Sequence, residues 1–165
     1  MIGKGKSISH GVAALEYDLA KEINGQAVAT EIARHELYGC TGAEMVQEMK
    51  PYHIDFPNVK NNCLRFEVSP SIEESATFTD ADWAELGNDF MQRMGLANHQ
   101  YIIIRHSGTE SKKEQAHLHI LANRVSLSGE LYRDNWIGKK ATEAANAIAK
   151  ERNFVQSQDI GKANK

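Results

Sequence analysis

Two histidines, His117 and His119, alternate with apolar residues in the stretch EQAHLHILANRV at 114–125. Side chains at positions i and i+2 of a strand point to the same face, so both imidazoles are expected on one face. Burying an imidazole costs free energy unless the ring finds a polar partner. One such partner is a metal ion shared by the two rings. The alternative is that one ring is exposed and the other bonds a backbone carbonyl.

A third histidine, His106, ends the apolar segment YIIIRH at 101–106. If this segment pairs with 116–125 as an antiparallel hairpin, His106 lies beside the other two histidines. Three neutral imidazoles are a common ligand set for divalent metals, and three protein ligands leave positions open for water or substrate. The pattern predicts a catalytic metal site at His106, His117 and His119 that polarises a phosphoryl or carbonyl oxygen.

Tyr17 is the candidate nucleophile among the five tyrosines. Residues 9–23 predict a helix capped by Ser9, and its apolar stripe consists of Val12, Leu15, Leu19 and Ile23. At ~100° per residue, Tyr17 points roughly opposite this stripe, one turn before Lys21. The alternative is a surface tyrosine that is half packed on another element.

Hydrophobic periodicity and capping residues in the rest of the sequence predict the helices and strands that position these residues. Further helices are expected over 42–49, 80–94 and 139–152, further strands over 63–69 and 131–134, and a loop over 71–79. The hairpin of 101–106 and 116–125 would form the central pair of the sheet. This order predicts an α+β fold, a central antiparallel β-sheet with helices packed on it.

Length and composition limit the classes of protein to which this chain can belong. The 165 residues fit one domain, expected over 1–155, followed by a polar and disordered tail over 156–165. No apolar run reaches the ~18 residues of a membrane span, and no secretory signal is visible, so no membrane insertion is expected. Two cysteines, Cys40 and Cys63, fit a reducing cytosol. The net charge of −3 argues mildly against a general nucleic-acid binder.

The chain resembles the relaxases, the mobilization nucleases of the tyrosine type and P-type class within the HUH (His-hydrophobe-His) endonucleases. The resemblance covers about residues 8–152 and is most specific over 101–129. Relaxases carry a strand ending in His, a polar loop, a His-x-His, an Asn-Arg-Val and a nearby Gly. Here these are His106, His117, His119, Asn123, Arg124, Val125 and Gly129. The stretch GVAALEYDLAK is similar to the segment that holds the tyrosine nucleophile.

The resemblance implies an HUH-like fold and strand-specific DNA nicking at a plasmid or transposon transfer origin. Tyr17 would attack the scissile phosphate and become linked to the 5′ end, while His106, His117 and His119 would hold Mn²⁺ or Mg²⁺, with Zn²⁺ as a further option. Expected contacts to single-stranded DNA are Asn123, Arg124, Lys21, Lys112 and Lys113. For Asn123, a hydrogen bond at the strand end is the alternative.

The resemblance also implies a bacterial cytoplasmic location, an accessory mobilization protein, a secretion-system coupling protein, and a nuclease domain that is often part of a longer chain. One position departs from the family pattern. Many relaxases have an acid two residues after the first motif histidine, where this chain has Gly108.

Two alternatives remain open. A rolling-circle replication initiator would share the His-x-His but place its tyrosine after that motif, where this chain has Tyr132. A non-catalytic DNA-binding module would use the histidines structurally and would take up no metal.

Overall fold

The computed structural model describes residues 1–108 and 115–156. Five antiparallel strands form the central sheet in the order β1-β5-β7-β6-β4. Their bounds are β1 Ile2–Ile8, β4 Ala29–His35, β5 Cys63–Ser69, β6 Tyr101–His106 and β7 His117–Asn123. The predicted hairpin is confirmed as β6 and β7, and β7 is the middle strand of the sheet.

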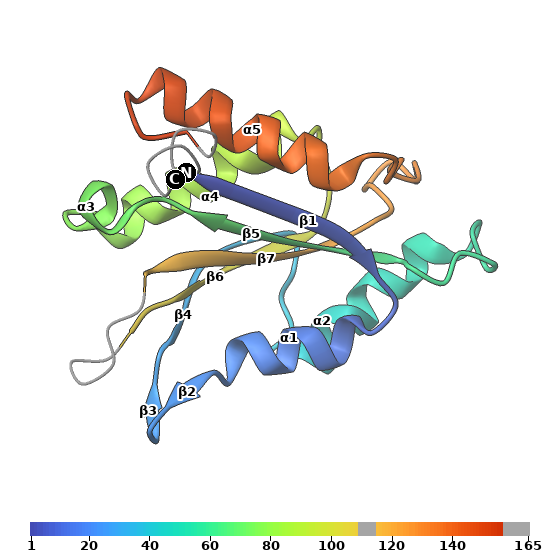
Figure 1. Cartoon of the computed structure of the whole chain (residues 1–165). Helices are drawn as coiled ribbons and strands as arrows, with labels where there is room; N and C mark the ends of the chain where they lie inside the picture. The colour runs from blue at the N-terminus through green and yellow to red at the C-terminus, as the bar shows by residue number, and fades with distance from the viewer. Residues whose placement is uncertain (109–114, 157–165) are drawn as a thin grey trace.

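Helices cover both faces of this sheet (Figure 1). One face carries α1 (Gly11–Leu19), α2 (Gly42–Met49) and the 3₁₀ turn η1 (Lys50–His53). The opposite face carries α4 (Asp80–Arg93) and α5 (Ile137–Glu151), with the short α3 (Ile72–Ser75) before α4. Each face has its own apolar core, so the expected α+β fold with helices on an antiparallel sheet is confirmed. No helix in the described ranges is long and apolar enough to cross a membrane.

Three local predictions are wrong. The segment 131–134 forms no strand, and only Leu131 makes an isolated bridge, to Val125. The segment 71–79 contains helix α3, because Ser71 and Glu74 form a reciprocal capping box that starts a turn there. The helix expected over 9–23 ends at Leu19, and the chain then forms the two-stranded ribbon β2 (Glu22–Ile23) and β3 (Gln26–Ala27). Asn24 and Gly25 join these strands with positive φ values of 52° and 79°, which is the Asn-Gly chemistry of a two-residue hairpin turn.

The face of the sheet under α1 and α2 carries the candidate site. Here the alternating residues of β6 and β7 comprise Ile102, Ile104, Leu121 and the three histidines. Ile102, Ile104 and Leu121 pack into the core below the helices. The histidines adjoin this apolar patch toward the end of the hairpin, where His119 pairs with Ile104 and His106 pairs with His117. The sheet therefore buries the apolar half of the face and presents the imidazoles next to α1.

Candidate metal and nucleic-acid site

The hairpin brings His106, His117 and His119 into one cluster. His106 and His117 are directly paired across β6 and β7, and His119 lies two residues further along β7 on the same face. The centroid of the His106 ring lies 4.3 Å from that of His119 and 5.6 Å from that of His117. One ring nitrogen from each residue lies within 4.8 Å of the other two. The juxtaposition inferred from the sequence is present in the structure.

Hydrogen bonds orient the three rings. Nε2 of His106 lies 2.7 Å from the carbonyl oxygen of Asp18, and Nδ1 of His117 lies 2.9 Å from that of Gln115. A carbonyl oxygen only accepts, so both nitrogens donate in these bonds. Nε2 of His117 lies 3.0 Å from Nε2 of His119. Two nitrogens bound to one ion at ~2.0–2.1 Å lie about 3–3.5 Å apart, so this pair has the spacing of two metal ligands.

Burial favours the neutral form of two imidazoles, those of His106 and His119. It lowers the pKa of His106, whose side chain is 3% exposed, and it lowers the pKa of His119 to about 2. The charges of His106, His117 and Arg65 act on His119 in the same direction. A histidine must be deprotonated to bind a metal ion, and the lowered pKa values of His106 and His119 favour that form. The three residues thus fit a divalent metal in spacing, and the protonation of His106 and His119 fits it as well.

Helix α1 is attached to this cluster through Asp18. Its main-chain oxygen bonds His106, and its carboxylate pairs with the guanidinium of Arg65 on β5. The pair is bidentate, with Nη2 to Oδ1 at 2.5 Å and Nε to Oδ2 at 3.2 Å. Asp18 is 1% exposed although an apolar pattern gives no reason to bury it. A single residue therefore connects the helix to two strands of the sheet.

Tyr17 directly precedes Asp18 and faces outward. Its side chain is 58% exposed, in agreement with its predicted position away from the helix's core-facing residues. The ammonium group of Lys21 donates a hydrogen bond to the Tyr17 hydroxyl at 3.1 Å and lies 5.3 Å from the ring centroid. The phenol is thus accessible and has a cation at its oxygen.

Among the residues that the structure describes, two acids lie near the cluster, while Gly108 occupies the position where many relaxases have an acid. Asp18 is the first, and Glu67 on β5 is the second, directly opposite His119 in the strand register. The alternation of 63–69 puts Cys63, Arg65 and Glu67 on the histidine face, and this alternation is the signal by which the sequence could have located Arg65 and Glu67. No such pattern in the sequence indicates that Asp18 lies beside the histidines.

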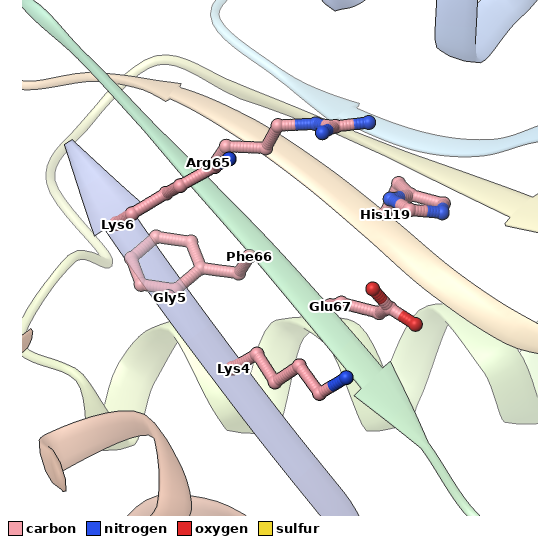
Figure 2. A pocket seen from close by; sticks show the side chains of 7 residues that line it. All are labelled: Lys4, Gly5, Lys6, Arg65, Phe66, Glu67 and His119. Atoms are coloured by element: carbon pink, nitrogen blue, oxygen red, sulfur yellow. The ribbon is translucent and has the colours of Figure 1, made fainter. Parts of the chain in front are cut away.

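A hollow of about 220 Å³ opens beside His119. Figure 2 shows its lining, which comes from three adjacent strands. The polar residues in this lining are Lys4, Lys6, Arg65, Glu67 and His119. Lys4 and Lys6 come from β1, a strand that the sequence analysis did not assign.

Asn123 and Arg124, both expected DNA contacts, make several hydrogen bonds within the protein. Asn123 is fully buried; its amide donates to Gln100 Oε1 and the Met49 carbonyl and accepts from His53. The Arg124 guanidinium bonds two carbonyl oxygens and lies 3.2 Å from Asp134. The placement of Asn123 agrees with its alternative, a hydrogen-bonding role at the strand end. Lys112 and Lys113 lie outside the described residues.

The comparisons with known proteins agree with this geometry. Residues 17–154 match the family model described as relaxase, MobA/VirD2-like, nuclease domain. No match was found among curated proteins or among solved structures. Relaxases are divalent-metal-dependent nucleases that nick DNA in mobilization and bind single-stranded DNA. Because the match covers more than half of the 165 residues, this chain belongs to the relaxase family.

Proposed function

We propose that this relaxase domain nicks one DNA strand at a specific site of a transfer origin and becomes covalently linked to the 5′ end through Tyr17. The observation that carries the proposal is the hydrogen bond between the Asp18 carbonyl and His106. Asp18 follows Tyr17 directly, so this bond holds the nucleophile's helix against the histidine cluster.

His106, His117 and His119 are the residues that would hold a divalent cation, with Mn²⁺ or Mg²⁺ expected and Zn²⁺ as an alternative. A bound cation supplies polarisation of the phosphoryl oxygens and offsets the negative charge that develops in the transition state. The clustering of the three rings and their fixed orientation are what the protein contributes.

In the proposed step, the Tyr17 oxygen forms a bond to the scissile phosphorus. The bond from phosphorus to the 3′ oxygen breaks, the phenol loses its proton, and the departing 3′ oxygen takes one up. One phosphodiester replaces another, so no hydrolysis occurs and the strand can be rejoined. The Lys21 ammonium group, 3.1 Å from the phenol oxygen, stabilises the negative charge that forms there.

The contacts of Tyr132 favour Tyr17 over the tyrosine that a replication initiator would use. Tyr132 follows the His-x-His, but its hydroxyl donates to the Met94 carbonyl at 2.8 Å and its ring packs against the core of α4 and α5. That core lies on the opposite face of the sheet from the histidines. Single-stranded DNA at the origin is the proposed substrate, and an accessory mobilization protein and a coupling protein are the proposed partners.

The test is formation of a tyrosyl–DNA adduct with a single-stranded origin oligonucleotide and Mn²⁺. Tyr17→Phe should abolish the adduct and leave Mn²⁺ binding intact, while Tyr38→Phe, which alters another exposed phenol, should form it normally. His117→Ala should lose both the adduct and Mn²⁺ uptake. An adduct that persists in Tyr17→Phe would refute the nucleophile. Absence of metal uptake by the wild-type chain at neutral pH would favour the non-catalytic module.

A further inference from the structure

The edge strand β1 presents two lysines to the histidine face. Lys4 and Lys6 alternate with Gly3 and Gly5, which face α5 on the other side of the sheet. A Cβ on Gly3 would lie 2.4 Å from the Ala141 carbonyl oxygen, so the helix approaches the strand too closely for a side chain there. Since alternate residues point to opposite faces, Lys4 and Lys6 are the β1 residues that line the hollow with their side chains, and Gly5 between them lines it without one.

The strand register connects these lysines to the cluster. Lys4 pairs with Glu67, and Glu67 pairs with His119, so the three residues form a row across β1, β5 and β7 (Figure 2). Lys6 pairs with Arg65 in the adjacent row. Neighbouring strands are ~4.8 Å apart, so the lysine strand lies about 10 Å from the strand of His119. The hollow thus runs sideways from the candidate metal site to the edge of the sheet.

Charge in the hollow favours an anion. Arg65 is compensated by Asp18. The hollow also holds one carboxylate, that of Glu67 opposite Lys4, against the two lysines. Neither Lys4 nor Lys6 makes an ion pair or a hydrogen bond through its ammonium group with any residue of the described ranges. One uncompensated positive charge remains, which matches the single negative charge of a phosphodiester.

We propose that the hollow lined by Lys4, Lys6 and Arg65 binds one backbone phosphate of the DNA strand, to one side of the scissile phosphate at the histidine cluster. The proposal rests on the proposed function. The two lysines lie before residue 17, outside the residues that match the family model, and no comparison assigns them a role. Lysines on an edge strand also discourage pairing between sheets, but that role does not require a hollow that leads to His119.

The experiment measures binding of a single-stranded origin oligonucleotide to the Tyr17→Phe chain with Mn²⁺ over a range of salt concentrations. Lys4→Gln with Lys6→Gln should weaken binding about 3- to 10-fold. The slope of log affinity against log salt should fall by about 0.7, the value for one phosphate contact on a single strand. Lys150→Gln, an exposed lysine on α5 at the opposite face, is the matched control and should change neither quantity.

A second series of oligonucleotides is shortened one nucleotide at a time from each end. The effect of the double lysine variant should vanish abruptly when one particular nucleotide is removed, and from one end only. Unchanged affinity and slope in a soluble variant, or an effect equal to that of Lys150→Gln, would overturn the subsite. Aggregation together with unchanged affinity of the monomer would assign the lysines to edge protection and also overturn it. Failure of the wild-type chain to form an adduct would instead contradict the proposed function.

Discussion

The carboxylate of Asp18 and the guanidinium of Arg65 form a bidentate ion pair between helix α1 and strand β5. Asp18 is 1% exposed and the Arg65 side chain 22% exposed, so the pair is largely shielded from water. Because the Asp18 main chain also bonds His106, the pair fixes the helix relative to both β5 and β6. The position of Tyr17 follows from these two contacts.

Substituting Asp18 and substituting Arg65 should lower the free energy of unfolding by different amounts. Removing one partner of a buried pair costs roughly 3–5 kcal/mol, and Arg65 keeps some access to water, so Asp18→Asn should cost about 2–3 kcal/mol. Arg65→Met should cost more, because it leaves a buried carboxylate without its partner. Unfolding in urea measures the loss of stability in both variants. The melting temperature should fall by about 4–12 °C in Asp18→Asn.

The matched control is Asp80→Asn, which removes the partner of Arg105 at a site where the carboxylate is 70% exposed. A loss below about 1 kcal/mol is expected there. The double variant of Asp18 and Arg65 should lose less stability than the sum of the two single losses. Strict additivity would show that the two groups do not interact.

The burial pattern of α1 could be predicted only in part from the sequence. The apolar stripe predicted burial of Val12, Leu15, Leu19 and Ile23. Leu15 and Ile23 are buried and Leu19 packs on the core, but Val12 is exposed and the helix buries Asp18. Hydrophobic spacing cannot predict a buried carboxylate, since the burial depends on an arginine 47 residues away. The β6–β7 hairpin was predictable because its residues are β-branched or apolar and its partner strand is local in sequence.

Strand β1 was missed for a different reason. Its sequence IGKGKSI has glycines at the positions that face α5, and glycine in a strand normally indicates a weak or interrupted element. Here the small residue is required by the close approach of Ala141 and of the Phe66 ring. That requirement is a property of the packed structure and leaves no periodic apolar signal in the sequence. Because the strand was not predicted, Lys4 and Lys6 were not recognised as part of the candidate site.

The two cysteines should react very differently with a thiol reagent. Cys63 is fully buried, and burial raises the pKa of its thiol to about 12, whereas Cys40 is exposed. The thiolate is the reactive form, so the native protein should consume one equivalent of reagent near neutral pH and the urea-unfolded protein two. Cys40→Ser should abolish the native reaction. Rapid reaction of a second thiol in the native wild-type chain would contradict the burial of Cys63.

Stability should fall as the pH drops below about 6.5, partly because of His99. Burial lowers the pKa of His99 below its ordinary value, and this effect outweighs its hydrogen bond to the Asn123 carbonyl and the charge of Glu130. The unfolded chain therefore binds a proton at a higher pH than the folded chain does, and protonation favours unfolding. Burial also lowers the pKa values of His106 and His119, so protonation of these residues likewise favours unfolding.

Urea unfolding at pH 7.5, 6.5 and 5.5 measures this dependence. His99→Gln should reduce the loss of stability between pH 6.5 and 5.5 by up to about 1.4 kcal/mol, the equivalent of one proton over one pH unit. His10→Gln, at an exposed position, should retain the wild-type dependence. An unchanged pH dependence in His99→Gln would mean that His99 titrates alike in the folded and unfolded chains.

Trp136 should be replaceable with a gain in stability. It precedes α5 with φ 59° and ψ 28°, in the left-handed region that costs a non-glycine residue roughly 1–2 kcal/mol, and its side chain is 78% exposed. Asparagine tolerates this conformation, so Trp136→Asn should raise the free energy of unfolding by about 0.5–1 kcal/mol. Fluorescence of the variant then reports Trp83 alone, which is 3% exposed and packs edge-on against Phe78, so its emission should shift to shorter wavelength. A loss of stability in Trp136→Asn would show that the indole makes a stabilising contact that outweighs the strain of its backbone.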